Sequence, residues 1–227
     1  MNVAILLSGG TGTRLGEQIP KQYIEVMNRP LIAYCFDALT MSSKIDAICI
    51  VAAADWHEYI KEHCMTSKDI IFAKPGRNRQ ESIYNGLKII EKSFQKVHSV
   101  FIHDAARPYL TENMIEDYYD ALEGYDGVLP VLPMKDTVYF SQDGTKVDQL
   151  LKRECIYAGQ APEIFVFDKY LQANMDLLPD RILNINGSTE PAIMASMNIH
   201  MVPGEEKNFK ITTRADLDRF SSEIMHR

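Results

Sequence analysis

The chain has 227 residues, of which 46% are hydrophobic and 24% are charged, and its formal net charge is −7. This composition is typical of a globular protein, and the acidic balance argues against general nucleic-acid binding, which leaves a basic footprint. No apolar run approaches the roughly 20 residues of a membrane span, and the N-terminal apolar run lacks the basic region of a signal peptide.

Short apolar runs alternate with helical patterns over the first half of the chain. Continuous apolar runs predict buried strands, and apolar residues at helical spacing predict helices. The alternation of the two predicts an α/β fold with a doubly wound, mostly parallel sheet. In chain order, the predicted elements are a strand over Asn2–Leu7, a helix over Leu31–Leu39, a strand over Ala47–Ala53, a short helix over Trp56–Cys64, a strand over Asp69–Ala73, a helix over Ser82–Phe94, a strand over Val97–Ile102, a helix over Asn113–Leu122 and a strand over Gly127–Leu132.

The pattern changes after Pro133. Two strand-like pieces flank the turn Gln142-Asp143-Gly144, which is a hairpin signal. We expect a β-arm over about residues 135–158 that leaves the sheet and contacts another subunit. No linker or repeat follows, so we expect one domain over residues 1–227. The predicted elements here are the pieces Thr137–Phe140 and Lys146–Leu151, a helix over Asp168–Leu178 with Asp168 as its N-cap, a strand over Ile199–Val202 and a helix over about Ala215–Met225.

The four cysteines are Cys35, Cys49, Cys64 and Cys155, and none forms a CxxC pair or has a histidine at metal-ligand spacing. We therefore expect free thiols in a reducing, cytoplasmic setting. Because the net charge is −7, an anionic substrate must be attracted locally by a few well-placed lysines and arginines.

The stretch LLSGGTGTRLGEQIPKQY, from Leu6 to Tyr23, follows the first predicted strand. Its glycines allow backbone N–H groups to approach phosphate oxygens closely. Arg14 and Lys21 then add full charges, one as a planar fork and one as a point charge. The stretch lacks the GK[ST] ending of a P-loop and a complete GxGxxG. It predicts an anion site of another kind, and the alternative is a plain turn with solvated Arg14 and Lys21.

The stretch Val100–Pro108 predicts a second part of the site. Its strand delivers His103 and Asp104 to the carboxyl end, where open α/β sheets bind ligands. An aspartate there is suited to Mg²⁺, which takes carboxylate and phosphate oxygens. The alternative is that Asp104 caps the next turn and pairs with Arg107, and both a functional and a structural role remain open for His103.

Two further stretches carry polar groups of interest. Gly76–Leu87 bridges a strand end and a helix start, so its backbone and Ser82 are suited to read a base edge, although a serine there is usually a helix cap. Lys210 lies between Phe209 and Ile211, and burial of its charge requires an anionic partner. The alternative for Lys210 is a solvated lysine at the edge of a strand.

Seven segments occur in the order found in one family and cover nearly the whole chain. They are GGTGTRLG with PKQY, GRNRQESIYNGL, HDAARP, PMKDTV, the segment around Arg153, GQAPEIF and NFKITTRADL. The chain therefore resembles the cytidylyltransferases that couple CTP to a polyol phosphate. The two best-known branches act on 2-C-methyl-D-erythritol 4-phosphate, in isoprenoid synthesis, and on D-ribitol 5-phosphate, in wall and capsule synthesis. The resemblance implies a Rossmann-like nucleotidyltransferase fold.

The resemblance also implies how CTP is bound. Arg14 and Lys21 resemble the catalytic pair on the CTP phosphates, and Lys210 resembles a third catalytic cation near them. Gly76 and Ser82 resemble contacts to the base and ribose. The implied CTP-binding residues are Ser8, Gly9, Gly10, Thr11, Gly12, Thr13, Gly76, Ser82 and Asp104.

The resemblance further implies a polyol-phosphate site at Asp104 and Arg107. Thr137 and Arg153 resemble arm residues that bind the polyol phosphate and, in this family, reach the site of the neighbouring subunit of a homodimer. Asp104 is the implied metal-binding residue, and Mg²⁺ or another divalent cation is the implied cofactor. No nucleic acid or membrane partner is implied.

The implied reaction is attack of a phosphate oxygen on the α-phosphorus of CTP, with pyrophosphate as the leaving group. A phosphate monoester has a second pKa of about 6, so the nucleophile is largely ionised at neutral pH and needs no strong general base. Catalysis of such a transfer therefore depends on positioning the reactants and on electrostatic stabilisation of the transferring group.

The chain departs from the family pattern at two places. Gln160-Ala161-Pro162-Glu163 stands where the family usually has Gln-Thr-Pro-Gln, so one hydroxyl is missing. Residues 186–192 lack the acidic start that the isoprenoid branch typically carries in an Asp-Glu-Ala-Ser-like string. Asp55-Trp56 and the GGTGTRLG loop look more like the ribitol branch, so D-ribitol 5-phosphate is the favoured acceptor and 2-C-methyl-D-erythritol 4-phosphate the alternative.

Two other functions remain open. Sugar-1-phosphate nucleotidylyltransferases that use UTP or GTP also begin with a glycine-rich loop, an arginine and a Pro-Lys, although HDAARP and the Arg153 arm argue against them. A nucleotide-binding regulator without catalysis is the third hypothesis, since the departures at Ala161 and around Glu190 give it some support.

Overall fold

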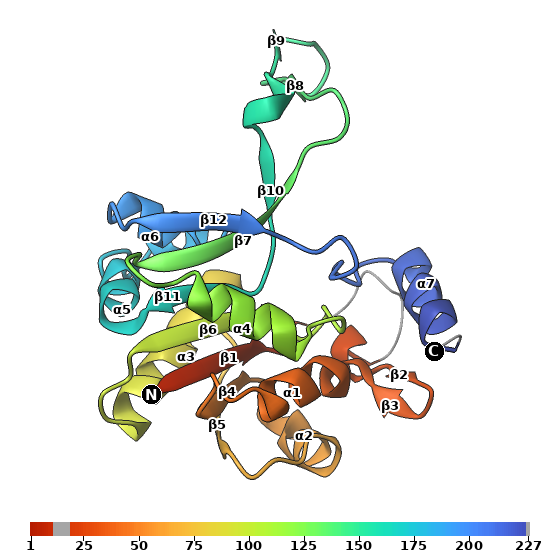
Figure 1. Cartoon of the computed structure of the whole chain (residues 1–227), viewed down its shortest axis with the longest axis vertical. Coiled ribbons are helices and arrows are strands. Elements are labelled where there is room, and N and C mark those ends of the chain that lie inside the picture. Colours follow the sequence, from red (N-terminus) through yellow and green to blue (C-terminus); the bar gives the residue numbers. More distant parts are fainter. Residues whose placement is uncertain (11–18, 226–227) are drawn as a thin grey trace.

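The computed structural model describes residues 1–10 and 19–225, and it has a central sheet with helices on both faces and a projecting arm (Figure 1). Strand β1 pairs in parallel with β4 and β6, and β4 pairs in parallel with β5. The sheet strands are β1 (Asn2–Leu7), β4 (Ala47–Val51), β5 (Asp69–Ala73), β6 (Ser99–Asp104), β7 (Gly127–Pro133), β10 (Tyr157–Gly159), β11 (Glu163–Val166) and β12 (Ile199–Pro203). The predicted doubly wound, mostly parallel sheet is confirmed.

One half of the sheet contains the antiparallel pairs. Strand β11 lies between β6 and β7 and is antiparallel to both. Strand β10 continues along the same edge of β7, where it leads into the arm, and β12 pairs in parallel with β7. Because β11 inserts beside β6, its first residue, Glu163, lies near the carboxyl end of β6, where Asp104 lies.

Alternating residues of the strands serve two cores, as the two-residue period of a strand requires. Leu6 and Phe101 belong to a core with α1, α2 and α4, whereas Ile5 and Ile102 belong to a core with α3 and α5. A third cluster packs α7 against the start of α1. The helices are α1 (Leu31–Met41), α2 (His57–His63), α3 (Arg79–Ser93), α4 (Glu112–Asp120), α5 (Phe167–Met175), α6 (Glu190–Met194) and α7 (Arg214–Met225).

Short elements complete the description. They are the 3-10 helices η2 (Lys21–Tyr23), η3 (Ala54–Trp56), η4 (Arg153–Cys155) and η5 (Arg181–Asn184), and the two-residue strands β2 (Glu25–Val26), β3 (Arg29–Pro30), β8 (Tyr139–Phe140) and β9 (Gln149–Leu150). The described helices include none with both the length and the apolar character that crossing a membrane requires. The four cysteines are free thiols, three buried and Cys155 exposed.

Several expectations differ from the structure. Strand β6 ends at Asp104 rather than at Ile102, so His103 and Asp104 belong to the strand itself. Asp168 is not a helix cap: α5 begins at Phe167, whose backbone N–H donates to the His98 carbonyl and whose side chain is buried. Strand β11 and helix α6 were not predicted, because both are too short to show a period.

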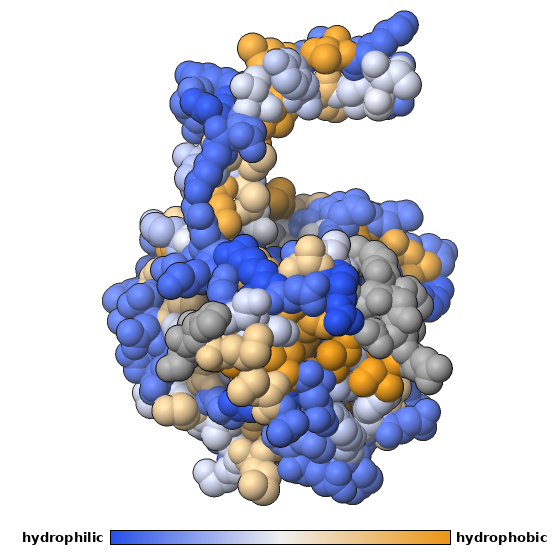
Figure 2. All heavy atoms as spheres, turned by 90° about the vertical axis from the view of Figure 1, so that its right-hand side faces the viewer, coloured by the Kyte–Doolittle hydropathy of each residue, from blue (hydrophilic) through white to orange (hydrophobic). Residues whose placement is uncertain are grey.

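The arm is a hairpin that stands away from the body of the molecule (Figure 1). Strands β8 and β9 are antiparallel, and Gly144 has a φ of 75° in the predicted turn, a conformation that favours glycine. Figure 2 shows apolar side chains on the arm among hydrophilic ones. Tyr139, Phe140, Val147 and Leu150 are all exposed there, and Val147 reaches 67%. Such a free apolar hairpin is typical of a surface that contacts another chain.

Candidate active site

The carboxyl ends of β1 and β6 open into a cavity of about 480 Å³. This edge of a parallel sheet is the ligand-binding edge of open α/β folds. The wall combines backbone of two glycine-containing loops with cationic side chains and one carboxylate. Among the residues that line it are Gly10, Lys21, Gly76, Arg79, Asp104 and Lys210.

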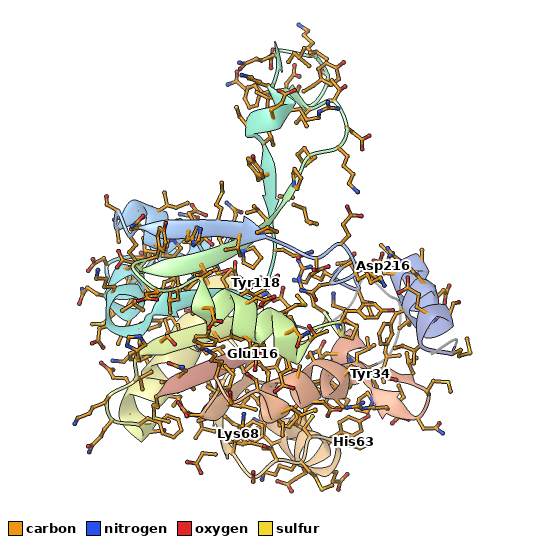
Figure 3. The ribbon with its side chains drawn as sticks, viewed as in Figure 1. Tyr34, His63, Lys68, Glu116, Tyr118 and Asp216 are labelled. Atoms are coloured by element: carbon orange, nitrogen blue, oxygen red, sulfur yellow. The ribbon has the colours of Figure 1, made fainter. Side chains whose placement is uncertain are left out.

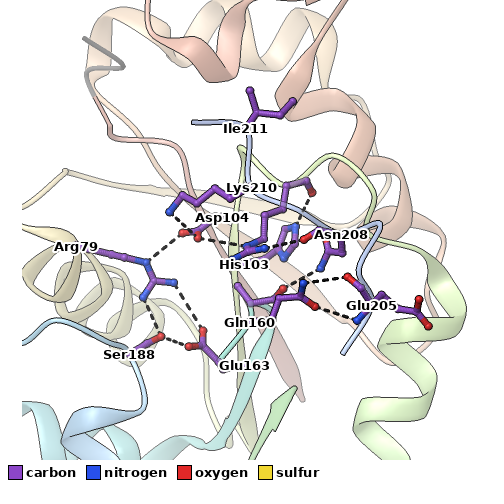
Figure 4. A network of polar contacts seen from close by, with 12 residues as sticks. Arg79, His103, Asp104, Gln160, Glu163, Ser188, Glu205, Asn208, Lys210 and Ile211 are labelled. Atoms are coloured by element: carbon purple, nitrogen blue, oxygen red, sulfur yellow. Dashed lines mark hydrogen bonds and ion pairs between the residues drawn. The ribbon is translucent and has the colours of Figure 1, made fainter. Parts of the chain in front are cut away.

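Asp104 is the centre of charge in this wall (Figure 4). Its Oδ1 accepts a hydrogen bond from Arg79 Nε at 3.1 Å, and its Oδ2 accepts one from Lys210 Nζ at 2.9 Å. The Arg107 Nε lies 3.9 Å from the same Oδ2. Burial alone would raise the pKa of Asp104, but Arg79, Lys210 and Arg107 together outweigh it and hold the pKa well below its usual range. Asp104 is therefore a carboxylate throughout the neutral range.

Lys21 lies on η2 and lines the cavity beside the chain segment that carries Lys210. Its Nζ donates to the Ile211 carbonyl oxygen at 2.7 Å, so the two lysines come from adjacent segments. Gln22 is buried, and its Nε2 donates to the carbonyl oxygens of Ser8 and Gly10 at 2.7 and 2.8 Å. Gln22 thereby fixes the start of the glycine loop against the helix that presents Lys21.

The first residues of the glycine loop are closely packed. Ser8 is buried, and its Oγ donates to the Tyr23 hydroxyl at 2.9 Å. A Cβ at Gly9 would lie 2.7 Å from Pro75, whereas one at Gly10 would meet no atom of the described residues within 4 Å. Gly9 therefore permits close contact between two loops.

The loop before α3 is held by Ser82 and Asn78. The Gly76 N–H donates to Ser82 Oγ at 2.9 Å, and Ser82 Oγ donates to the Asn78 carbonyl at 2.8 Å. The helix cap is Asn78, whose Oδ1 accepts from the Glu81 N–H. A Cβ at Gly76 would lie 2.6 Å from the Glu81 backbone, so only glycine fits there. Ser82 lines the cavity and fixes the conformation of this loop.

Arg107 and His103 lie behind Asp104. Arg107 Nη1 donates to the Asn208 carbonyl at 2.6 Å, and His103 Nε2 lies 2.9 Å from the Arg107 carbonyl, which it reaches as an N–H donor. Burial lowers the pKa of His103 to about 4, so the ring is neutral at pH 7. Asn208 Nδ2 also donates to the carbonyl of Ala161, at 2.9 Å. These contacts attach the 208–211 segment, with Lys210, to the end of β6.

The remaining predicted site residues lie elsewhere. Thr137 and Arg153 are exposed on the arm, where Arg153 Nη1 donates to the Lys135 carbonyl, and neither lines the cavity of its own chain. Arg14, Thr11, Gly12 and Thr13 lie outside the described residues.

The structure adds Arg79 and Gln22 to the lining residues. Both lie inside segments that the sequence marks, GRNRQES and PKQY, but the pattern does not say which polar side chain of a segment turns inward. Arg79 is the central case: it is the third residue after Gly76, at the first position of α3, and its side chain reaches the end of β6.

The site is suited to bind a polyanion. Lys21, Arg79 and Lys210 line the cavity with a single carboxylate, Asp104, among the lining residues that the structure describes. The same part of the chain contains no group of three or more His, Cys, Asp or Glu side chains arranged around a metal position. A Mg²⁺ ion commonly takes one or two carboxylates and completes its shell with substrate phosphates and water. Asp104 fits a cation held in that way.

Comparisons with known proteins agree along the whole chain. A family model described as IspD, 2-C-methyl-D-erythritol 4-phosphate cytidylyltransferase, matches residues 2–226. A protein of Thermotoga neapolitana with that enzyme name is 34% identical over 218 residues, which are 96% of this chain and 94% of the relative. A ribitol-5-phosphate cytidylyltransferase of Lactiplantibacillus plantarum is 30% identical over 224 residues, 96% and 95% of the two chains. The crystal structure of 4-diphosphocytidyl-2C-methyl-D-erythritol synthase from Anaerococcus prevotii has a TM-score of 0.84 and 25% identity, covering 100% of this chain and 96% of that one.

Proposed function

The chain belongs to the IspD family of cytidylyltransferases, and we propose that it transfers CMP from CTP to a polyol phosphate, releasing pyrophosphate and forming a CDP-polyol. The observation that carries the proposal is the Asp104 carboxylate, which Arg79 and Lys210 hold at the wall of a cavity that Lys21 also lines. In this arrangement the cationic side chains offset the negative charge of the two bound anions. Before the anions bind, the carboxylate offsets part of the positive charge, so the folded protein tolerates the cluster.

We assign the triphosphate of CTP to the side of the cavity with Gly9, Gly10 and Lys21. Backbone N–H groups and a lysine point charge suit phosphate oxygens there. The family resemblance adds Ser8, Thr11, Gly12, Thr13 and Arg14 to this part of the proposal. We assign the base to the loop from Gly76 to Ser82, whose tight packing leaves backbone groups at the cavity wall.

The reaction follows from these charges. A phosphate oxygen of the acceptor forms a bond to the α-phosphorus of CTP, and the bond from that phosphorus to the β-bridging oxygen breaks. The electron pair leaves with pyrophosphate. Lys21, Lys210 and Arg14 stabilise charge on the transferring group and on the leaving group, and no side chain is required as a strong base.

Mg²⁺ is the proposed cofactor, with Asp104 as its protein ligand. When bound, the cation supplies positive charge to the phosphate oxygens. Arg79 and Lys210 fix the Asp104 side chain in a single position through their hydrogen bonds to its two oxygens. Arg107, with its guanidinium close to Asp104 and to the Asn208 carbonyl, is proposed as the inner part of the polyol-phosphate site.

We further propose a homodimer in which the arm of one subunit completes the site of the other. Thr137 and Arg153 are exposed on the arm, and its apolar side chains Phe140, Val147 and Leu150 need a covering surface. In this arrangement the positively charged Arg153 side chain of one subunit contacts the acceptor phosphate in the site of the other subunit, which binds CTP. The chain acts as one domain with an arm, and its four free cysteines fit a cytoplasmic location.

The two acceptors to compare are D-ribitol 5-phosphate and 2-C-methyl-D-erythritol 4-phosphate. The departures in the sequence favour ribitol phosphate, whereas relatives carry both names at similar identity. The experiment is pyrophosphate release with CTP, UTP, GTP and ATP, each with both polyol phosphates and Mg²⁺, and identification of the product by mass spectrometry. We expect turnover with CTP and one polyol phosphate. CTP binding in calorimetry without turnover on either acceptor would instead indicate a regulator.

A further inference from the structure

Arg79 contacts three partners from three different parts of the chain (Figure 4). Its Nε donates to Asp104 on β6, and its Nη1 donates to Ser188 Oγ at 2.8 Å, in the segment before α6. Its Nη2 lies 3.7 Å from Glu163 Oε2 on β11. Two of its nitrogens donate hydrogen bonds and the third lies at ion-pair distance from a carboxylate, so the side chain bridges the cavity and the sheet.

Glu163 is a buried carboxyl group at the far side of Arg79. The residue is 7% exposed, and its Oε1 accepts a short hydrogen bond from Ser188 Oγ. Burial raises its pKa, and the charge of Arg79 opposes that rise. Glu163 is not among the described residues that line the cavity, and Arg79 lies between it and the cavity-lining Asp104.

The direction of the hydrogen bonds links Arg79 to Glu163 through Ser188. Arg79 Nη1 can only donate, so Ser188 Oγ accepts from it and has its own proton left for another acceptor. That proton points to Glu163 Oε1, which makes a chain from Arg79 through Ser188 to the carboxyl group. The Ser188 contact fits either protonation state, because a carboxyl group protonated on Oε2 still accepts at Oε1. The Arg79 guanidinium, whose Nη2 lies 3.7 Å from Oε2, is the group that favours the ionised form of Glu163.

The residues on either side of Arg79 in the sequence, Asn78 and Gln80, also contact the part of the chain around Ser188. Asn78 Nδ2 donates to the carbonyls of Ile182 and Leu183, at 3.0 Å each. Gln80 Nε2 donates to Asn174 Oδ1 at 2.6 Å, and the Tyr170 hydroxyl, which Gln80 also contacts, donates to the Ser188 carbonyl. Three consecutive side chains at the start of α3 thus fix the segment that carries Ser188.

We propose that Glu163 is a positioning residue: with Ser188 it holds the Arg79 guanidinium against Asp104, so that the cavity has a fixed cation and a fixed carboxylate at the acceptor side. The inference rests on the proposed function for its kinetic consequence. Both departures of the sequence from the family pattern meet here, since Ser188, in the stretch that lacks the acidic start, donates to Glu163 of Gln160-Ala161-Pro162-Glu163. The required feature is one negative charge beside Arg79, whichever of the two positions carries it.

This requirement is testable by moving the charge. Glu163→Gln keeps the size of the side chain and removes its charge, and Ser188→Asp added to Glu163→Gln returns a carboxylate to the other contact of Arg79. Glu62→Gln, the same chemical change at an exposed position on α2, is the control. The readouts are the thermal midpoint of the full chain and steady-state kinetics with CTP and the polyol phosphate.

We expect Glu163→Gln to lower the thermal midpoint and to reduce kcat with the polyol phosphate by about tenfold, the effect of losing one charge-assisted contact. The KM for CTP stays close to that of the parent, since the base is assigned to backbone groups of the Gly76–Ser82 loop and the triphosphate to Gly9, Gly10 and Lys21, not to the Arg79 side chain. The double variant recovers at least half of both losses, and Glu62→Gln matches the parent. A purely structural role would lower the thermal midpoint without changing kcat.

Three results would overturn the inference: unchanged midpoint and kcat in Glu163→Gln, a lower midpoint with unchanged kcat, or a folded double variant without recovery. If the double variant does not fold, Glu163→Asp decides, because the proposal requires it to exceed Glu163→Gln in kcat. The thermal data also separate this inference from the proposed function. Even if the chain has no cytidylyltransferase activity, the thermal midpoint of the double variant still shows whether the second carboxylate restores stability.

Discussion

Lys210 Nζ and Asp104 Oδ2 lie 2.9 Å apart, although 106 positions separate the two residues in the sequence. The contact joins the end of strand β6 to the segment before α7. It gives the cavity a cation that comes late in the chain and a carboxylate that comes from the central sheet. The same lysine is available to phosphate oxygens in the cavity, because a third of its side chain is exposed.

Lys210 is predicted to be required for turnover. Lys210→Ala removes a cation from the transferring phosphate and should reduce kcat by about two to three orders of magnitude, as the loss of one oxyanion donor does. Lys207→Ala, at an exposed position of the same segment, is the matched control and should retain parental activity. Circular dichroism checks that both variants fold. Parental kcat in a folded Lys210→Ala protein would disprove the role.

Asp104 is predicted to support stability as well as activity. Asp104→Asn leaves Arg79, Lys210 and Arg107 without their shared counter-charge. We expect a loss of about 3 kcal/mol in the free energy of unfolding, at the low end for a broken buried pair because Arg79 and Lys210 keep some solvent exposure. Urea unfolding at pH 7 measures it.

The control for Asp104 is Asp120→Asn, which breaks a surface pair with Lys44. Exposed pairs contribute roughly 1 kcal/mol or less, so this variant should unfold close to the parent. Equal effects of the two substitutions would mean that the charges around Asp104 do not stabilise the fold.

Asp216 is predicted to make the stability of the last helix depend on acid pH. It lies in the first turn of α7 (Figure 3), and its Oδ2 accepts from the N–H groups of Thr212 and Thr213, while Thr213 Oγ1 accepts from the Asp216 N–H. This is a capping box. Partial burial acts to raise the pKa of Asp216, but the hydrogen bonds from Thr212 and Thr213 outweigh it and lower the pKa to about 2.

A lowered pKa means that the contribution of Asp216 is fully present above its unfolded pKa, near 4, and is lost as the pH falls toward about 2. Asp216→Asn should therefore destabilise the protein by about 1 kcal/mol at pH 7. The difference from the parent should shrink as the pH falls below about 4 and disappear only below about 2, as followed by urea unfolding or CD-monitored melting. A difference that is independent of pH would show that the charge of Asp216 plays no part.

The arm is predicted to act between subunits. Lys21→Ala removes a cation from the cavity, and Arg153→Ala removes one from the arm, so each homodimer alone should be inactive. In a mixed dimer, the intact cavity of one chain meets the intact arm of the other. Random exchange of equal amounts should restore about one quarter of parental activity. If the mixture stays inactive although mass spectrometry detects mixed dimers, the arm does not complete the partner's site.

The sequence predicts the sheet because its strands are buried on both faces and are therefore continuously apolar, as in Ala47–Val51. It does not predict β11, whose four residues begin with the charged Glu163 and run antiparallel between two longer strands. The end of β6 is also not predicted: the strand continues to Asp104, so the carboxylate is part of the strand and is buried.

The motifs of the site are each visible in the sequence, but their contacts are not. Nothing in GRNRQES shows that Arg79 turns toward Asp104 while Arg77 pairs with Glu81 at the surface. The other contacts of Arg79 are Glu163 and Ser188, which come from later elements that the segment itself does not reveal. Lys210 is marked by its apolar neighbours, and the anionic partner that its position requires is Asp104.

The most direct test of the proposed activity is the product formed by the purified chain from CTP, Mg²⁺ and a polyol phosphate, measured with D-ribitol 5-phosphate and with 2-C-methyl-D-erythritol 4-phosphate in parallel. A CTP-dependent cytidylyltransferase releases stoichiometric pyrophosphate and forms a CDP-polyol from one of the two, and it forms no such product with UTP, GTP or ATP. Release of no pyrophosphate with CTP and either acceptor, from protein that is folded and binds CTP, would contradict it.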